Sequence, residues 1–169
     1  MPEFRQAKTD EDLSEVRDLF WEYLQWANGR VNEEFDVNFD IETMLEDNMR
    51  DLDIYFPPDG RLVLASEERN VAGLGCLKKL HEGIGEVKRM YVRPQFRGRG
   101  LGRGILQALL SEAREIGYSR VRLDSARFMT AAHSLYRSAG FQEIEEYEGS
   151  EIPPEFREHW IFMEKTLKE

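Results

Sequence analysis

A loop with four glycines joins a strand-like segment to an amphipathic helix, and this junction constrains the fold more than any other part of the chain. The loop, RGRGLGRG, has glycine at positions 98, 100, 102 and 104. The strand-like segment 86–92 (EVKRMYV) precedes it, and apolar residues recur at helical spacing from Ile105 to Ile116, where Gly117 ends the helix. A strand leading into such a helix predicts a helix packed on a sheet.

The other apolar patterns extend this arrangement to the whole chain. Strands are expected at 4–7, 61–67, 71–80, 86–92, 120–126, 141–147 and 160–167. Helices are expected from Thr9 to Asn28–Gly29, over 39–52, from about residue 101 to Gly117, and over 130–139. An antiparallel meander followed by strand–helix–strand units predicts an α/β (α+β) fold, with a mixed central sheet of about six to seven strands and helices on both faces.

Composition limits the class of protein. A length of 169 residues predicts one domain spanning 1–169 with a substantial hydrophobic core. No apolar run approaches the ~20 residues of a membrane span, and the N-terminus lacks the pattern of a signal peptide. Cys76 is the only cysteine, which favours a reducing, cytoplasmic setting. Three scattered histidines give no metal-site spacing, and an acidic pI argues against nucleic acid as a partner.

Positive charge is concentrated around the glycine loop. Residues 88–103 contain six lysine or arginine side chains and no acid, in a chain with a formal net charge of -10. A concentrated basic patch on an acidic protein favours a locally bound polyanion. The alternative is a solvated charged strand and turn.

The glycines favour a phosphate ligand. A helix that begins near residue 101 leaves its first N–H groups without intrahelical partners, at the positive end of the helix dipole. Glycine lets a phosphate approach the backbone and permits positive φ angles, while Arg97 and Arg99 could add charge-assisted bonds. An ordinary strand-to-helix turn, the alternative, rarely needs four glycines.

Two common phosphate-binding motifs do not match. A Walker A loop would need lysine followed by serine or threonine, where the chain has Arg103 and Gly104. The dinucleotide fingerprint would need a third glycine at Arg103. Asp124 lies about twenty residues further on, where a ribose contact is found in dinucleotide sites, but without the fingerprint it gives little support. Nucleotide and NAD binding are therefore disfavoured.

A third pattern, Q/R-x-x-G-x-G/A, matches Gln95 to Gly100. Together with the preceding strand EVKRMYVRP and the downstream segment AAHSLYRSAGF (131–141), it resembles the GNAT superfamily of acyl-CoA-dependent N-acyltransferases. The resemblance is close over roughly 86–141 and looser on either side. It implies a GNAT-like fold and acetyl-CoA as co-substrate, without a metal.

The resemblance also implies positions for the co-substrate. Backbone amides of the loop would bind the pyrophosphate, and the pantetheine arm would run beside Met90 and Val92, as an added strand does. The Met90 amide would also suit the thioester oxygen as it becomes an oxyanion. Ala132 matches the small residue that lets its helix approach the cofactor. The implied loop positions are Arg97, Gly98, Arg99, Gly100, Leu101 and Gly102.

Two catalytic residues are implied in the same way. Glu86 matches a glutamate that several members use as general base; with an ordinary pKa of ~4.3 it would need partial burial or a relaying water, and a solvated strand-end acid is the alternative. Tyr136 matches the tyrosine that many members place near the coenzyme sulfur, where it would donate a hydrogen bond to the developing thiolate; an aromatic core residue is the alternative. Met129 stands where many members have asparagine, so a polar contact to the coenzyme arm would be missing.

The acceptor site is implied between the first two helices and the central strands. This region includes nine acids within residues 33–53, and Trp21 lies beside the apolar stripe of the first helix. These features favour a cationic small molecule, a polyamine or a basic peptide terminus, with a solvated helix face as the alternative. Homodimers are common in the superfamily.

The function that follows is transfer of an acetyl group from acetyl-CoA to a primary amine, by direct attack through a tetrahedral intermediate. A non-catalytic acyl-CoA-binding regulatory domain is one alternative. An NAD- or nucleotide-binding protein is another.

Overall fold

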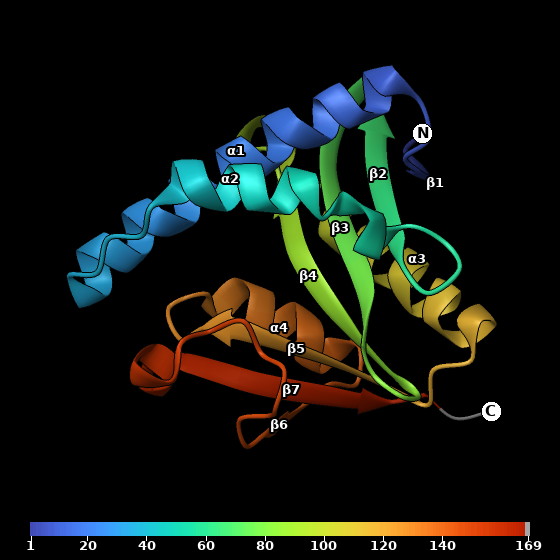
Figure 1. Ribbon diagram of the computed structural model, residues 1–169. Helices are drawn as coiled ribbons and strands as arrows, with labels where there is room; N and C mark the ends of the chain where they lie inside the picture. Colours follow the sequence, from blue (N-terminus) through green and yellow to red (C-terminus); the bar gives the residue numbers. More distant parts are fainter. Residues whose placement is uncertain (168–169) are drawn as a thin grey trace.

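A computed structural model describes residues 1–167 and has a seven-stranded mixed sheet with helices on both faces (Figure 1). The sheet order is β1-β2-β3-β4-β5-β7-β6, and only β4 and β5 pair in parallel. The predicted mixed sheet and antiparallel meander are confirmed. The strands are β1 Glu3–Gln6, β2 Arg61–Glu67, β3 Asn70–His81, β4 Ile84–Val92, β5 Arg120–Ala126, β6 Gln142–Ile144 and β7 Trp160–Thr166. The helices are α1 Asp10–Phe35, α2 Ile41–Arg50, α3 Leu101–Ile116 and α4 Thr130–Ser138, with 3-10 turns at Leu52–Tyr55 (η1), Pro94–Phe96 (η2) and Pro154–His159 (η3).

The alternation of side chains along the strands divides the interior into two cores. In β2, Leu62 and Leu64 pack with residues of α1 and α2. Val63 and Ala65 point to the other face and pack with residues of α3 and α4. Within residues 1–167 no helix is both long and apolar enough to cross a membrane.

The parallel strands β4 and β5 separate part of the way along their length. Their residues pair only from Ile84 opposite Arg120 to Glu86 opposite Arg122. Beyond this point β4 continues to Val92 on the meander side, and β5 continues beside β7 (Figure 1). The backbone edges that face each other across the gap are therefore available to a ligand.

A β-bulge in β4 lies at the gap. Leu74 is opposite Tyr91 and Cys76 is opposite Lys88, so β4 has one residue more than β3 between these pairs. Arg89 takes a positive φ of 59° there. A bulge re-aims side chains, and both Lys88 and Arg89 reach the same carboxylate, that of Glu151.

The first helix is longer than the sequence predicts. Asn28–Gly29 does not end it, since α1 continues to Phe35 and is closed by Asp36 in the left-handed region. The added turns bury Val31, and Phe35 stacks on His159 with ring centroids 4.1 Å apart. These tertiary contacts outweigh the roughly 1 kcal/mol cost of a glycine inside a helix. The prediction of the helix end was wrong for this reason.

The strand expected at 141–147 is also shorter than predicted. Only Gln142–Ile144 pairs with β7, and the chain then leaves the sheet. Tyr147 turns inward, where its hydroxyl donates to Glu86 Oε2 at 2.7 Å. This side-chain contact replaces the ladder that a longer strand would have made.

Asp12 fixes the start of α1. It forms a capping box with Thr9, and both of its oxygens accept hydrogen bonds at 2.8 Å from the guanidinium of Arg5 on β1. We expect Asp12→Ala to lower the free energy of unfolding by about 1–2 kcal/mol. Urea denaturation measures this, and Asp18→Ala, at an exposed position of the same helix, is the control with an expected change below about 0.5 kcal/mol.

The contribution of Asp12 depends on pH in a defined direction. The hydrogen bond from Arg5 holds the pKa of Asp12 well below its ordinary value, against the opposing effect of burial. A carboxyl with a lowered folded-state pKa stabilises the fold above its unfolded pKa, and this stability is lost as the pH falls toward the folded one. The difference between Asp12→Ala and the unmodified chain should therefore shrink below about pH 4. If Asp12→Ala left the free energy of unfolding unchanged at neutral pH, the stabilising role of Asp12 would be contradicted.

Candidate active site

A cavity of about 540 Å³ lies where β4 and β5 separate. It is lined from α1, α2, β4, β5, α4, the loop before η3 and the start of β7. Five residues selected from the sequence are brought together in its lining: Met90, Val92, Arg97, Ala132 and Tyr136. The split between the parallel strands thus places the loop-side end of β4 and one face of α4 around a single space.

The loop that precedes α3 has the geometry of an anion site. Gly98 and Gly100 both have φ of +81°, and a Cβ at either would meet no atom of the described residues within 4 Å. The N–H groups from Gly98 to Arg103 donate to no oxygen of residues 1–167. These free donors lie at the N-terminus of a sixteen-residue helix, so the loop fits a pyrophosphate group. The Arg97 amide differs, because it donates to the Pro94 carbonyl at 3.2 Å.

The last two glycines of the loop have other surroundings. A Cβ at Gly104 would collide with the ring of Phe4 on β1, so this glycine is required by helix–sheet packing. A Cβ at Gly102 would make an ordinary contact with Leu135 of α4 at 3.6 Å. Only Gly98 and Gly100 therefore meet the backbone requirement inferred for an anion-binding loop.

The basic residues of 88–103 do not form one continuous patch. Glu151 pairs with Lys88 Nζ at 2.7 Å and with Arg89 at 2.9 Å, and Arg93 pairs with Glu22 at 3.1 Å. Three of the six positive charges are thus offset by acids from other segments. The expected polyanion surface is reduced to the arginines of the loop and of the first turn of α3. They are Arg97, Arg99 and Arg103.

Arg97 lies between the loop and the cavity. Its Nε donates to the Val92 carbonyl at 2.8 Å, and its guanidinium lies 5.6 Å from the ring centre of Trp26 and 5.5 Å from that of Tyr91. These contacts fix the side chain at the mouth of the cavity, where it could meet an anionic group.

Tyr136 points from α4 into the cavity lining. Its ring makes an edge contact with Phe141 at 5.9 Å, and its hydroxyl has no hydrogen-bond partner in the described chain. Burial raises the pKa of Tyr136, and the nearby Tyr23 and Asp124 raise it further. The phenol therefore stays protonated and available as a donor.

Met129 also lines the cavity, at the N-cap position of α4. Its sulfur accepts a long hydrogen bond from the Ser125 hydroxyl at 3.7 Å. The missing asparagine is thus replaced by a thioether contact within the chain. Ala132, in the first turn of α4, also lines the cavity, and its small side chain leaves space there.

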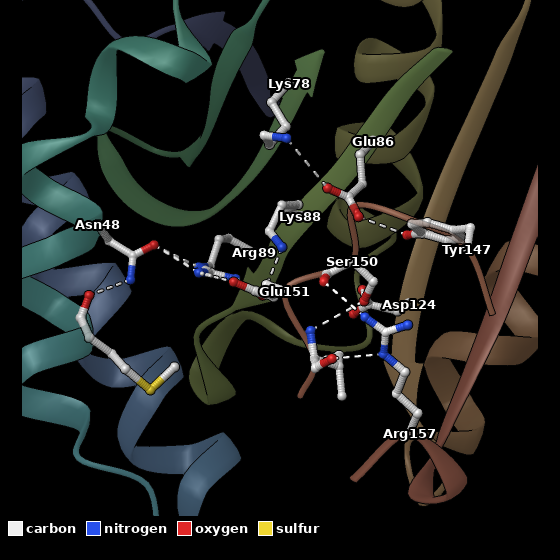
Figure 2. Close-up of polar contacts among 12 residues, drawn as sticks. Asn48, Lys78, Glu86, Lys88, Arg89, Asp124, Tyr147, Ser150, Glu151 and Arg157 are labelled. Atoms are coloured by element: carbon white, nitrogen blue, oxygen red, sulfur yellow. Dashed lines mark hydrogen bonds and ion pairs between the residues drawn. The ribbon is translucent and has the colours of Figure 1, made fainter. Parts of the chain in front are cut away.

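Glu86 lies outside the lining of the main cavity. Its carboxylate is buried between Tyr147, whose hydroxyl donates to it at 2.7 Å, and Lys78 at 3.8 Å (Figure 2). It lines a second hollow of about 270 Å³, which shares Met44, Lys88, Arg89 and Glu151 with the main cavity. Its role as the base stays a prediction.

Asp124 is a carboxylate of the cavity that sequence reasoning did not select for catalysis. It comes from β5, just beyond the last pair with β4, and the Ser150 hydroxyl donates to its Oδ2 at 2.9 Å (Figure 2). Burial raises the pKa of Asp124 to about 6, against the lowering effect of Lys88. The only sequence signal for Asp124 was an acid in the strand segment RVRLDSA, and the alternation of polar and apolar residues in that strand already accounted for it.

Glu151 links the cavity wall across three segments. It binds Lys88 and Arg89 of β4, and Arg89 in turn donates to Asn48 Oδ1 of α2 at 2.8 Å (Figure 2). Partial burial opposes ionisation of Glu151, but Arg89 and Lys88 outweigh it and hold its pKa below the ordinary value. Within residues 1–167 no group of three or more histidine, cysteine or acidic side chains is arranged to hold a metal ion.

The chain is similar in sequence to known acetyltransferases. The model of the acetyltransferase (GNAT) family matches residues 13–141. An uncharacterized N-acetyltransferase of Schizosaccharomyces pombe is 32% identical over 151 residues, which cover 87% of this chain and 86% of the relative. An IAA acetyltransferase of Azospirillum brasilense is 34% identical over 146 residues, covering 85% of this chain and 93% of the relative.

A solved structure shares the fold over its full length. The PaiA N-acetyltransferase of Thermoplasma acidophilum, determined in complex with coenzyme A, superposes with a TM-score of 0.74 at 18% identity and covers 99% of both chains.

Proposed function

Because the chain belongs to the GNAT family of acetyltransferases and is an acetyl-CoA-dependent N-acetyltransferase, we propose that it acetylates a primary amine with Asp124 as proton acceptor and Tyr136 as hydrogen-bond donor to the leaving sulfur. The observation that carries this proposal is the placement of both groups in the lining of one cavity, each with a raised pKa. Perturbed titratable groups that converge on a cavity are the usual arrangement of acid–base catalysts.

The co-substrate is held by backbone groups. The free N–H groups from Gly98 to Arg103 would bind the pyrophosphate of acetyl-CoA. The edge of β4 at Met90 and Val92, which β5 does not pair with, would bind the pantetheine arm, and Ala132 would leave room for it. Acetyl-CoA supplies the acetyl group as a thioester, whose carbon is activated for attack by an amine.

Asp124 makes the amine nucleophilic. An alkylammonium has a pKa near ~10 and attacks only after losing a proton. A carboxylate with a pKa of about 6 is ionised at neutral pH and is a stronger base than an ordinary aspartate. The ammonium gives one proton to Asp124, the free amine attacks, the nitrogen–carbon bond forms and the carbon–sulfur bond breaks. The second proton leaves the nitrogen as the tetrahedral intermediate collapses and passes to the coenzyme A thiolate or to solvent.

Tyr136 acts on the leaving group. As the carbon–sulfur bond breaks, the sulfur gains negative charge, and an unpartnered phenol in the cavity wall can donate a hydrogen bond to it. Full proton transfer is uphill, since a phenol at ~10 is a weaker acid than a thiol at ~8.5, and burial raises the pKa of Tyr136 further. The role is therefore stabilisation by a hydrogen bond.

We expect Tyr136→Phe to lower kcat by about tenfold, with a smaller change in the KM for acetyl-CoA, because the lost bond forms mainly in the transition state. Steady-state release of the coenzyme A thiol measures both parameters. Tyr118→Phe, which removes a hydroxyl bonded to the Asp59 carbonyl, is the matched control. Unchanged kcat would return Tyr136 to the role of an aromatic core residue.

The experiment that tests the function itself is thiol release from acetyl-CoA in the presence of a panel of primary amines. Amine-dependent release, with the acetylated amine found by mass spectrometry, supports catalysis. Binding of acetyl-CoA without turnover on any amine would favour the regulatory acyl-CoA-binding alternative.

A further inference from the structure

We propose that the acceptor is a primary amine whose remaining part is uncharged, apolar and about the size of an aromatic ring. This inference rests on the proposed function and names its substrate class. It differs from the cationic acceptor that the acidic composition of residues 33–53 favours.

Apolar side chains from two distant parts of the chain contribute to the cavity lining, and together we call them its apolar wall. The segment from α1 to α2 contributes Phe39, Ile41 and Met44, and Ile152 and Trp160 come from the C-terminal region. A charged or strongly polar body placed here would lose its water without gaining partners. An apolar body would gain free energy from burial.

This wall is held in place by aromatic contacts. Phe39 packs edge-on against Phe156 at 5.5 Å, and Phe35 stacks on His159 at 4.1 Å. These contacts attach both the end of α1 and the segment between α1 and α2 to η3. The apolar part of the cavity is therefore formed before a ligand binds, as is usual for small-molecule sites.

The acids of residues 33–53 are used elsewhere, and none lines the main cavity. Asp40 caps α2, Glu46 pairs with Arg17 at 2.9 Å, and Glu34 pairs with Arg30 at 3.3 Å. Asp47 and Asp51 line the second hollow instead, and Arg50 pairs with both. The acids that do line the cavity are the proposed base Asp124 and Glu151, and Glu151 is already paired with Lys88 and Arg89. A second positive charge on the acceptor would thus find no unpaired acid besides the proposed base.

The basic side chains of the cavity also have partners within the chain. Lys88 and Arg89 share Glu151, Arg97 donates to the Val92 carbonyl, and Arg30 pairs with Glu34. A carboxylate on the acceptor would have to compete with these partners, and at Arg97 also with the anionic coenzyme, for the same cations. An amino acid is therefore disfavoured relative to the amine of the same skeleton.

The test is a set of matched acceptors in the thiol-release assay. 2-Phenylethylamine has the apolar body, phenylalanine adds a carboxylate to the same skeleton, spermidine adds positive charges, and methylamine lacks the body. We expect kcat/KM for 2-phenylethylamine to exceed that for methylamine by about tenfold to a hundredfold, the ratio expected for burying one phenyl-sized group. We expect it to exceed those for phenylalanine and spermidine by at least about tenfold, because their additional charges would lose water without gaining free partners. Equal or better use of spermidine or phenylalanine would overturn the inference while leaving N-acetylation intact.

A matched pair of variants places the effect in the cavity. Ile152→Asp puts a charge in the apolar wall, and Ile54→Asp makes the same change at an exposed position outside the main cavity. We expect Ile152→Asp to raise the KM for 2-phenylethylamine about tenfold, with the KM for acetyl-CoA unchanged, and Ile54→Asp to change neither. Equal effects of the two variants would contradict the assignment of this wall.

Measurements of amine binding separate the proposed catalysis from the proposed apolar acceptor site. If no amine is acetylated, the proposed catalysis fails, and thermal stabilisation of the coenzyme A-bound protein then decides the inference. Stabilisation by 2-phenylethylamine but not by phenylalanine or spermidine would still support an apolar amine site. Stabilisation by the charged compounds, or by none, would overturn it.

Discussion

Asp124→Asn is expected to lower kcat/KM by about a hundredfold to ten-thousandfold, the contribution of a positioned general base. The side chains have the same shape, and the asparagine oxygen can still accept the hydrogen bond from Ser150 that Asp124 accepts at 2.9 Å. The variant should therefore fold and bind acetyl-CoA as before. What it loses is the ability to take a proton from the amine.

The pH dependence provides a second readout. Because the base must be ionised and burial raises the pKa of Asp124 to about 6, kcat/KM should fall as the pH drops through this value. Asp124→Asn should lack this limb. Glu86→Gln is the comparison, since Glu86 is bound by Tyr147 outside the main cavity, and we expect a loss below about tenfold. If Glu86→Gln abolishes activity and Asp124→Asn does not, Glu86 is the base.

Gly100→Asp is expected to weaken acetyl-CoA binding by about a hundredfold, as judged by calorimetry. Gly100 is the N-cap of α3 at a φ of +81°, a region that aspartate tolerates better than most residues. Its carboxylate would lie among the free N–H groups and repel the pyrophosphate. An acid at a helix N-terminus is favourable in itself, so the fold should be retained.

Gly100→Asn separates the effect of the aspartate's negative charge from the effect of its size. Asparagine has the same size and the same tolerance of positive φ, but it is neutral. We expect it to weaken binding by less than about tenfold. Equal affinity of the aspartate variant and the unmodified protein would mean that the pyrophosphate binds elsewhere.

Elements held by local patterns are those that the sequence predicts well. β5 lies at the expected 120–126, and α3 begins at Leu101 and ends before Gly117 as expected. The end of α1 could not be predicted, because Phe35 is held by His159 from the far end of the chain. The short β6 has a similar cause, since Tyr147 leaves the sheet to bond Glu86.

Some residues of the candidate site could likewise be predicted from the sequence, and others could not. The loop glycines and the positions of Met90, Val92 and Tyr136 follow from motif spacing. Asp124 could not be selected, since its significance depends on where β4 and β5 stop pairing and on the burial that raises its pKa.

Composition alone was misleading about charge. The six basic residues of 88–103 read as one patch, but three of them pair with acids from other segments, Lys88 and Arg89 with Glu151 and Arg93 with Glu22 of α1. The acids of 33–53 likewise read as a binding surface, although the cavity residues of that segment are Phe39, Ile41 and Met44.

The proposed function depends most on the backbone N–H groups of Gly98 to Arg103, which would bind the diphosphate of coenzyme A. Amide NMR spectra recorded during titration with coenzyme A test it most directly, with pantetheine, which has no diphosphate, as the control ligand. Large shifts of the Gly98 and Gly100 amides with coenzyme A and small ones with pantetheine are the expected result. Saturation by coenzyme A with those two signals unmoved would contradict it.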